Sequence, residues 1–572
     1  MAELSHTIEE KVNSWLQDPS IDEATKEELK ALADQPAELE DRFYRDLEFG
    51  TGGLRGVIGA GSNRMNRYTV GRATQGLAQY LLKAHGNREG RPSVVIAHDS
   101  RHFSSEFALE AALVLAGNGI EAKLFPSLRP TPQLSFTVRH LGATGGIVIT
   151  ASHNPPEYNG YKVYNSNGGQ LVPHEAEQVI ANIKELTSFE QVRRLTREEA
   201  EAQGLLVWLG EAEDEAFFDA VAGASLNPDL LAAGAGKDVV VVFTPLHGTG
   251  NIPVRRVLDK LGFTQVHIVK EQELPDAEFS TVKSPNPEER EAFELAIELG
   301  EEVGADILIG TDPDADRMGA VVKNAAGKYE VLTGNQSGAI LVHYILSQMK
   351  DAGKLPSNGA VVKTIVTSEF GAEIARHYGA EVFNTLTGFK YIGEKMDQFE
   401  ESGNYTYLFG YEESYGYLAG NYARDKDAIV ASTLICEAAA YYKQQGKSLV
   451  DVLEELYAKF GYYRESLVSR TLKGKDGLEQ IVALMEKFRN EPPQSVGDIP
   501  VTKIEDFSVG LYGLPKENVL KFTLEDGSWF CLRPSGTEPK IKFYFAVRGT
   551  SGADSAARLE RLQEEVLKRV DA

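Results

Sequence analysis

Short, continuous hydrophobic segments alternate along most of the chain with longer segments whose hydrophobic residues recur at helical spacing. The short segments predict strands at residues 94–97, 146–150, 239–243, 306–309, 360–365 and 405–409. The longer segments predict helices at residues 105–118, 252–261, 288–299 and 338–349. Strands that are apolar on both faces and alternate with helices are typical of buried, largely parallel sheets. The pattern therefore predicts an α/β fold with mixed, largely parallel sheets.

The predicted strands recur in groups, spaced roughly 110–150 residues apart, and so indicate three similar α/β units. We place these units at residues 1–208, 209–325 and 326–446, and the first of them begins with a polar, acidic helical cap. The remaining segment, 447–572, has the order helix, three strands, helix, and it ends in an amphipathic stretch. That order predicts a smaller C-terminal α+β domain.

Length and charge narrow the class of protein. At roughly 150 residues per domain, the 572 residues of the chain suggest about four domains. With 84 acidic and 59 basic side chains, the formal net charge is −25. An acidic chain without a strong basic patch is not expected to bind nucleic acid, because it would repel a polyanion. A small anionic substrate stays compatible with this balance, since local charge can oppose net charge.

The sequence also bears on the compartment. The two cysteines, Cys436 and Cys531, are too few for a disulfide scaffold or a cysteine-based zinc cluster, and they fit a reducing cytosol. The first ten residues are acidic and lack the apolar core of a signal peptide. No window approaches the roughly 20 apolar residues of a membrane span. These features predict a cytoplasmic protein without a membrane segment.

A polar loop follows the predicted strand at 146–150 and carries Ser152. A serine hydroxyl beyond the carboxyl end of a strand can act as a nucleophile, and Pro155 and Pro156 stiffen this loop. The loop lacks the Gly-x-Ser-x-Gly pattern, so acyl transfer is not supported. The alternative is a polar turn in which the serine caps a helix.

A second loop follows the predicted strand at 306–309 and places carboxylates at alternate positions, namely Asp312, Asp314 and Asp316. Such carboxylates can converge on one hard cation such as Mg²⁺, and without a cation their like charges would repel one another. The segment does not match an EF-hand, because Arg317 stands where that motif requires glycine. A solvated acidic loop is the alternative.

Two further loops carry groups suited to a phosphorylated sugar. Glu412 and Ser414 follow the predicted strand at 405–409 and can hydrogen-bond to vicinal sugar hydroxyls, although a surface turn has a similar composition. In the last unit, the segment 533–540 combines Arg533 with two hydroxyls and a glycine. This combination can form a phosphate cradle, and a hairpin with incidental cations is the alternative.

Taken together and in this order, the loops resemble those of the α-D-phosphohexomutase superfamily, and within it the phosphoglucomutases. The similarity spans residues 45–550. The segments TASHNP (150–155) and DPDADR (312–317) are its most specific signatures, and EES (412–414) and RPSGTEPK (533–540) support them. The resemblance implies three similar α/β domains and a smaller C-terminal α+β domain around a central cleft.

Position by position, the resemblance implies a role for particular residues. It implies a phosphorylated Ser152 and one Mg²⁺ per chain, bound by the phosphoserine with Asp312, Asp314 and Asp316. Around the transferring phosphoryl group it implies Arg55, His153, Lys162 and Arg317, with Lys162 accepting the hydroxyl proton if nearby cations lower its pKa. For substrate binding it implies Thr387, Gly388, Glu412, Ser414, Lys426, Arg533, Ser535, Gly536, Thr537 and Lys542.

The implied activity is the interconversion of glucose 1-phosphate and glucose 6-phosphate, with glucose 1,6-bisphosphate as intermediate and activator. A phosphopentomutase is an alternative within the family, since Tyr411 and the long N-terminal extension are similar to a branch that includes phosphopentomutases. A phosphomannomutase is a less favoured alternative, because such relatives often carry another residue where Glu413 stands. A metal-dependent sugar phosphatase and a non-catalytic phosphosugar-binding protein are alternatives of other classes. The expected partners are small phosphosugars, and a monomer and a dimer both stay open.

Overall fold

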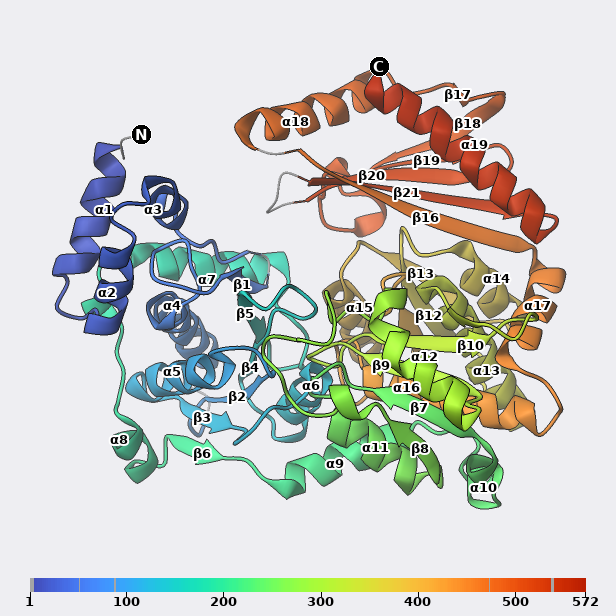
Figure 1. The fold of residues 1–572 in the computed structure, drawn as a ribbon, viewed down its shortest axis with the longest axis horizontal. Coiled ribbons are helices and arrows are strands. Elements are labelled where there is room, and N and C mark those ends of the chain that lie inside the picture. The colour runs from blue at the N-terminus through green and yellow to red at the C-terminus, as the bar shows by residue number, and fades with distance from the viewer. Residues whose placement is uncertain (1–4, 51, 87–88, 473, 536–539) are drawn as a thin grey trace.

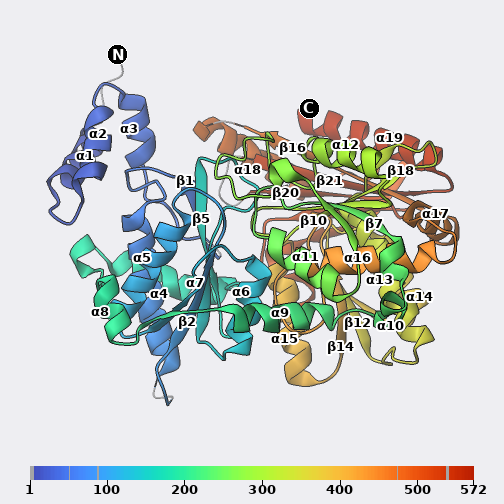
Figure 2. The same cartoon turned by 60° about the horizontal axis from the view of Figure 1, so that its bottom comes forward.

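The computed structural model describes residues 5–572 apart from residues 51, 87–88, 473 and 536–539. Its strands form four main sheets, one in each of four successive units (Figure 1). Unit I, blue to teal, lies beside units II and III, green to orange, in both Figure 1 and Figure 2. The C-terminal unit, red, lies on the side of units II and III in both views.

The chain begins with a helical cap, as the sequence predicted, made of α1 (His6–Gln17), α2 (Glu23–Ala31) and α3 (Pro36–Phe43). The ring centroids of Trp15 and Phe43 lie 5.6 Å apart, and those of Trp15 and Tyr68 in unit I lie 5.7 Å apart. Buried aromatic contacts of this kind attach the cap to unit I through a small core of its own.

Unit I contains a six-stranded sheet in the order β1-β5-β4-β2-β3-β6, in which β4, β2, β3 and β6 run parallel and β5 runs antiparallel between β4 and β1. Val94 and Ile96 of β2 pack with α4 and α5, whereas Val95 and Ala97 pack with α6 on the opposite face. A strand buried on both faces is a continuous apolar run, which is why the sequence predicts it. The elements are β1 (Gly53–Val57), α4 (Arg67–His85), β2 (Ser93–His98), α5 (Ser104–Gly117), β3 (Glu121–Leu124), α6 (Thr131–His140), β4 (Gly145–Ile149), β5 (Tyr158–Tyr164), α7 (Pro173–Glu185), α8 (Arg197–Ala202) and β6 (Leu206–Trp208).

Units II and III have smaller sheets with the orders β11-β10-β9-β7-β8 and β13-β12-β14-β15, again mainly parallel with antiparallel strands at one edge. Unit II comprises α9 (Glu211–Ala222), α10 (Pro228–Ala232), β7 (Val240–Thr244), α11 (Asn251–Lys260), β8 (Gln265–Ile268), α12 (Glu294–Val303), β9 (Ile307–Thr311), β10 (Met318–Lys323) and β11 (Tyr329–Val331). Unit III comprises α13 (Gly334–Asp351), β12 (Gly359–Thr364), α14 (Glu369–His377), β13 (Glu381–Thr385), α15 (Phe389–Ser402), β14 (Thr406–Tyr411), β15 (Tyr417–Ala419) and α16 (Ala428–Lys443).

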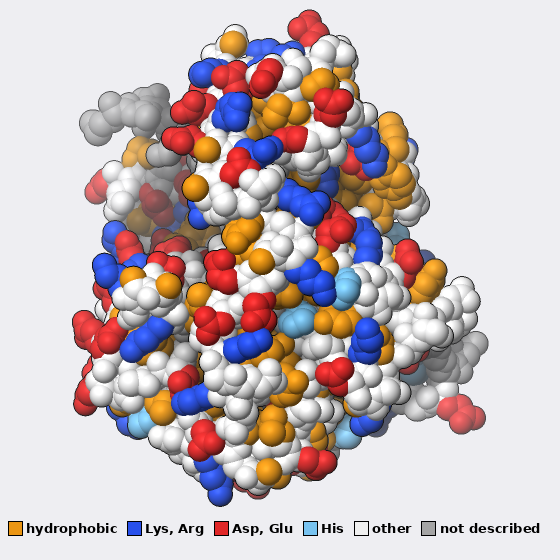
Figure 3. All heavy atoms as spheres, turned by 90° about the vertical axis from the view of Figure 1, so that its right-hand side faces the viewer, with side chains coloured by type: hydrophobic (Ala, Val, Ile, Leu, Met, Phe, Trp, Pro, Cys, Tyr) orange, Lys and Arg blue, Asp and Glu red, His pale blue; other side chains and the backbone are white. Residues whose placement is uncertain are grey.

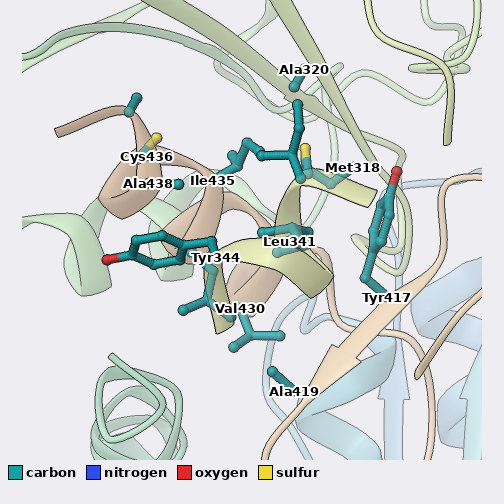
Figure 4. Packing of buried hydrophobic residues seen from close by; sticks show 14 of the residues in the cluster. Met318, Ala320, Leu341, Tyr344, Tyr417, Ala419, Val430, Ile435, Cys436 and Ala438 are labelled. Atoms are coloured by element: carbon teal, nitrogen blue, oxygen red, sulfur yellow. The ribbon is translucent and has the colours of Figure 1, made fainter. Parts of the chain in front are cut away.

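One hydrophobic core joins units II and III. Figure 4 shows Met318 of β10 close to Leu341 of α13, Ile435 of α16 and Tyr417 of β15, all within the same buried cluster. Because this cluster contains side chains from both sheets, the two units cannot be separated without exposing it to water. The core therefore fixes the loops of unit II relative to those of unit III.

The C-terminal unit is an α+β domain, as predicted, but it contains more elements than the sequence indicated. Its six-stranded sheet is antiparallel, in the order β16-β21-β20-β19-β18-β17, and a helix is inserted after its first strand. The prediction of three strands missed three others. β17 has two residues, and β16 and β18 consist mainly of exposed and half-buried positions, so none of the three has an apolar run. The elements are α17 (Leu449–Phe460), β16 (Tyr462–Thr471), α18 (Gly474–Asn490), β17 (Ser495–Val496), β18 (Ile499–Asp506), β19 (Leu520–Leu524), β20 (Trp529–Pro534), β21 (Lys540–Gly549) and α19 (Gly552–Asp571).

The acidic excess is not gathered in one place on the face of the molecule shown in Figure 3. Acidic and basic side chains are interspersed there over the whole height of the view, with hydrophobic side chains between them. Within the described residues, no helix is long and apolar enough to cross a membrane.

Candidate active site

Three of the four loops singled out in the sequence occupy equivalent places in the three α/β sheets. In each α/β unit a parallel strand leads through its loop into an antiparallel neighbour, at β4–β5, β9–β10 and β14–β15. The fourth loop joins β20 to β21. Loops beyond the carboxyl ends of parallel strands are the usual binding positions of open α/β sheets. Sheet topology thus explains why the polar signatures follow apolar runs.

Main-chain hydrogen bonds fix the carboxylate loop to units I and III. The Thr131 N–H of unit I donates to the Asp314 carbonyl at 2.9 Å, and the Ala428 N–H of unit III donates to the Ala315 carbonyl at 3.1 Å. The Met318 N–H donates to the Tyr415 carbonyl at 3.0 Å. The carboxylate loop is therefore fixed from both sides, by unit I and by unit III.

Ser152 lies in a buried, strained turn. Its φ of 53° is in the left-handed region, which is uncommon for a residue with a side chain. The Ser152 N–H donates to Thr150 Oγ1 at 2.9 Å, and its hydroxyl donates to Asp312 Oδ2 at 2.7 Å. The serine loop and the carboxylate loop thus meet at the serine oxygen.

Arg101 holds this turn and was missed in the sequence. Its guanidinium donates to the carbonyl oxygens of Ser152 at 2.6 Å and Pro155 at 2.8 Å, and also to that of Asn154. Its side chain is fully buried and pairs with Asp99 at 3.3 Å. The sequence could have indicated this role, because Asp99 and Arg101 follow the predicted strand at 94–97, just as the other polar loops follow their strands.

Asp312, Asp314 and Asp316 form a buried cluster, with one oxygen of each lying within 4.8 Å of the others. Burial and the neighbouring carboxylates raise the pKa of Asp312 well above its usual range. Asp314 Oδ1 and Asp316 Oδ1 are buried without a hydrogen-bond partner among the described residues. Uncompensated carboxylate oxygens that converge in this way fit a hard divalent cation such as Mg²⁺.

Lys162 and Lys426 compensate part of this charge. Lys162 Nζ lies 2.9 Å from Asp314 Oδ2 and 3.4 Å from Asp316 Oδ2, and Lys426 Nζ lies 3.1 Å from Asp316 Oδ2. Burial alone would lower the pKa of Lys162, but the two carboxylates outweigh it and raise the pKa. The condition that cations lower the pKa of Lys162 is thus not met, because its nearest charged groups are acids.

The other residues predicted around the phosphoryl group also lie at this place. His153 Nδ1 is 3.3 Å from the Ser152 hydroxyl, and burial together with Arg317 and Arg55 lowers the pKa of His153 well below its usual range. Arg55 on β1 donates to Asn154 Oδ1 at 3.4 Å. Arg317 pairs with Glu288 at 2.7 Å and donates to the Ser414 carbonyl at 3.2 Å.

The predicted sugar-binding residues meet across unit III. Glu412 is buried, and its Oε1 accepts a hydrogen bond from the Gly388 N–H at 3.0 Å. Burial raises the pKa of Glu412 to about 7, although the Lys426 ammonium opposes this rise. The Thr387 hydroxyl is buried and makes no hydrogen bond within the described part of the chain. The turn at Thr387 and the loop at Glu412 therefore present polar groups from two directions.

In the predicted phosphate loop, Arg533 and Lys542 are directly opposite each other on β20 and β21. Like charges in such a cross-strand pair repel one another and favour a bound anion. Burial and the cations Arg533, Lys540 and Arg317 lower the pKa of Lys542. Ser535 begins the loop, its N–H donating to the Lys540 carbonyl at 2.7 Å. Gly536 and Thr537 lie outside the described residues.

Comparisons with known proteins agree with this arrangement. Four family models match the chain, described as α/β/α domains I, II and III and the C-terminal domain of phosphoglucomutase/phosphomannomutase; they match residues 46–190, 215–327, 333–460 and 468–569. A phosphoglucomutase of Staphylococcus haemolyticus is 39% identical over 520 residues, which cover 89% of this chain and 91% of the relative. A phosphoglucomutase of Staphylococcus aureus (strain USA300) is 37% identical over 562 residues, which cover 95% of this chain and 97% of the relative.

Solved structures share the fold. The Paramecium phosphoprotein parafusin, a phosphoglucomutase in its open form, aligns with a TM-score of 0.71 at 20% identity, over 92% of this chain and 95% of its own. A phosphoglucomutase/phosphomannomutase family protein of Burkholderia thailandensis aligns with a TM-score of 0.65 at 18% identity, over 91% of this chain and 96% of its own.

The chain therefore belongs to the phosphoglucomutase/phosphomannomutase family of the α-D-phosphohexomutase superfamily. It is an enzyme of the isomerase class that transfers a phosphoryl group within its substrate. The resemblance seen in the sequence and the predicted fold class are both confirmed.

Proposed function

We propose that the chain interconverts glucose 1-phosphate and glucose 6-phosphate through a phosphoserine at Ser152 and a glucose 1,6-bisphosphate intermediate. The observation that carries this proposal is the contact of the Ser152 hydroxyl with Asp312 Oδ2 at 2.7 Å, beside two further buried carboxylates. The near full-length similarity to phosphoglucomutases supports glucose over pentose or mannose phosphates as the substrate.

The transfer takes two steps because the two reacting oxygens of the substrate lie at opposite ends of the sugar. The phosphoserine gives its phosphoryl group to the free hydroxyl, which loses its proton, and the bisphosphate forms while Ser152 regains a hydroxyl. The bisphosphate then turns around. Its other phosphoryl group moves to Ser152, and the product monophosphate leaves.

Asp312, Asp314 and Asp316 would hold Mg²⁺, which when bound supplies positive charge to the transferring phosphoryl group. The protein adds charge of its own around the same group. Lys162 and Lys426 are held as ammonium groups by the carboxylates, and Arg55 and Arg317 bring two guanidinium groups. A protonated Lys162 donates hydrogen bonds to phosphoryl oxygens. Its use as a proton acceptor would first require deprotonation, which Asp314 and Asp316 oppose.

Binding and orientation are assigned to the remaining loops. Thr387, Gly388, Glu412 and Ser414 would hold sugar hydroxyls, and the buried Thr387 hydroxyl is a donor and acceptor within reach of such a ligand. Arg533, Ser535 and Lys542, with Gly536 and Thr537, would hold the phosphate that does not react. Because either end of the sugar must fit, this loop recognises phosphate more than the ring. Closure of the C-terminal unit over the loops would exclude water and protect the phosphoserine.

The proposed location is the cytoplasm, and the proposed partners are small phosphosugars. Cys436 and Cys531 are buried free thiols, which suits a reducing compartment.

A coupled assay for glucose 6-phosphate formed from glucose 1-phosphate tests the proposal, run with and without Mg²⁺ and a catalytic trace of glucose 1,6-bisphosphate. We expect activity that depends on both additions. Net release of inorganic phosphate without isomerisation would instead indicate a sugar phosphatase. Parallel assays with ribose 1-phosphate and mannose 1-phosphate should give lower kcat/KM than glucose 1-phosphate.

A further inference from the structure

The connection between β18 and β19 is longer than an antiparallel pair requires. About two to five residues suffice to join such strands, whereas β18 ends at Asp506 and β19 begins at Leu520. The base of the connection is closed, because the Phe507 N–H donates to the Val519 carbonyl at 3.0 Å and both side chains are buried. We call residues 507–519 the β18–β19 excursion.

The excursion presents one carboxylate to the phosphate loop. Glu517 Oε1 accepts a hydrogen bond from Arg533 Nε at 3.1 Å. The Glu517 N–H donates to the Phe507 carbonyl at 3.1 Å, and the adjacent Asn518 accepts a hydrogen bond from Arg489 Nη2 at 2.7 Å. The position of Glu517 is therefore fixed by its own main chain and by its neighbour.

The hydrophobic surroundings fix the same region. Phe507 and Val519 belong to a buried cluster with Trp529 of β20 and Tyr544 of β21, and the cluster extends to Tyr391 of unit III. Trp529 and Arg533 both lie on β20. The excursion and the strand that carries Arg533 therefore share one core. A carboxylate held on such a rigid base can orient its partner, because little rotamer freedom is left to it.

Glu517 also acts on a cation of unit III. Burial and Arg533 lower the pKa of Lys390 to about 8, and Glu517 opposes this change. For Arg533, burial lowers the pKa, but Glu517 and Tyr544 outweigh it and raise the pKa. The carboxylate therefore balances Arg533 of the C-terminal unit and Lys390, which lies two positions after Gly388.

We propose that Glu517 is a positioning residue for Arg533: it engages the Nε edge of the guanidinium and so directs the Nη1–Nη2 edge to the substrate phosphate. A guanidinium is a planar fork, and it binds phosphate through two parallel hydrogen bonds only when its plane is set correctly. A carboxylate would repel a phosphate at close range, so Glu517 acts on the phosphate through Arg533. This inference rests on the proposed role of Arg533 in substrate binding.

The test compares full-length Glu517→Ala and Glu517→Gln with the wild-type enzyme, by KM and kcat for both glucose monophosphates and by calorimetric binding of inorganic phosphate. We expect Glu517→Ala to raise both KM values and weaken phosphate binding about three- to tenfold, as for the loss of one hydrogen bond, with kcat nearly unchanged. Glu517→Gln keeps an oxygen that can accept from Nε and should restore most of the affinity. In the Arg533→Ala background, Glu517→Ala should cause no further change in KM or in phosphate binding.

Glu505→Ala is the matched control, because it removes the oxygen on β18 that accepts a hydrogen bond from the Tyr512 hydroxyl of the same excursion at 2.7 Å. An equal effect of Glu505→Ala would show that loosening of the excursion, not the contact with Arg533, is responsible, and would overturn the inference. Unchanged KM and phosphate binding in Glu517→Ala would overturn it as well. If Arg533→Ala itself left phosphate binding unchanged, the proposed phosphate site would fail, which is a separate result.

Discussion

The loops that would carry out phosphoryl transfer and the loop that would bind the second phosphate are held in different ways. Main-chain hydrogen bonds join the carboxylate loop to α6 of unit I, through Thr131, and join Met318 after that loop to Tyr415 of the sugar loop. The serine loop meets the carboxylates through the Ser152 hydroxyl. Around the phosphate loop, by contrast, side chains make two contacts with the surroundings. Arg533 is held by Glu517, and Lys521 of β19 donates to the Ile365 carbonyl of unit III at 2.7 Å.

This difference matches the two tasks. A nucleophile and the charges around it must be held within a fraction of an ångström, and main-chain contacts between rigid units achieve this. A site that accepts the phosphate from either end of a sugar can be held by longer side chains on a separate unit. The core shared by units II and III removes freedom from the first region. The C-terminal unit has its own sheet and its own core, and a smaller buried cluster connects it to unit III.

Removing the serine hydroxyl should have the largest effect of all. Ser152→Ala should reduce mutase turnover to background, because no other group can carry the phosphoryl intermediate. Intact-mass analysis of active wild-type enzyme should show a phosphate-sized increment that maps to the peptide containing Ser152. Full activity in Ser152→Ala would contradict the proposed mechanism.

Replacing any one of Asp312, Asp314 and Asp316 by alanine should have the next largest effect. Mutase activity should fall at least about a hundredfold, which is comparable to the loss of one strong electrostatic stabiliser. Chelation should inactivate the wild-type enzyme, and added Mg²⁺ should restore it. Equilibrium metal binding by the variants gives a readout independent of activity. Activity that survives both chelation and the substitutions would show that the carboxylate loop is only structural.

Glu412→Gln tests the role of the Glu412 carboxyl in the sugar loop. Because burial raises the pKa of Glu412 from 4.5 to about 7, the folded state holds this proton more tightly than the unfolded state does. The stability of the wild-type protein should therefore fall as the pH rises through this range, by up to about 3 kcal/mol. Glu412→Gln stays neutral and should be more stable than wild type at pH 8 but not at pH 4, while binding glucose phosphates more weakly.

Urea unfolding at the two pH values measures this change. A stability difference that is the same at both would contradict the assigned titration. Binding of inorganic phosphate should be nearly unchanged in Glu412→Gln, which separates the sugar contact from the phosphate contact.

Arg533→Ala should have the smallest effect and act only on binding. A charge-assisted contact to phosphate is worth roughly 1.5–3 kcal/mol, so both glucose monophosphates should bind about tenfold more weakly or worse. Arg533→Lys should recover part of the affinity, since it restores charge but not the fork. If only one monophosphate were affected, a single site used by both ends of the sugar would be wrong for this protein.

Most of the fold could be predicted from the sequence because β2, β4, β9 and β12 are buried on both faces and so form continuous apolar runs. The C-terminal sheet was only partly predicted, since β18 has mainly exposed and half-buried positions and lacks such a run. The unit boundaries near residues 208, 325 and 446 stay predictions, as do the roles of the individual site residues.

The sequence by itself determined which chemical groups follow each strand, because a strand and the loop after it are neighbours along the chain. Ser152, the three aspartates and Arg533 were found in this way. It also determined the order of these loops along the chain. The pairing of each preceding strand with an antiparallel neighbour in units I, II and III is a feature of the sheets themselves.

Only the tertiary structure decided the partners of these groups. Arg101 reaches the serine turn from 51 positions away, and Lys162 reaches Asp314 across 152 positions. The excursion places Glu517 beside Arg533, which lies on β20, 16 positions further along the chain. Such contacts depend on strand order, register and the joining of units, and a pattern of hydrophobic and polar positions does not specify these. The charge state of Lys162 is therefore set by acids that are remote in sequence.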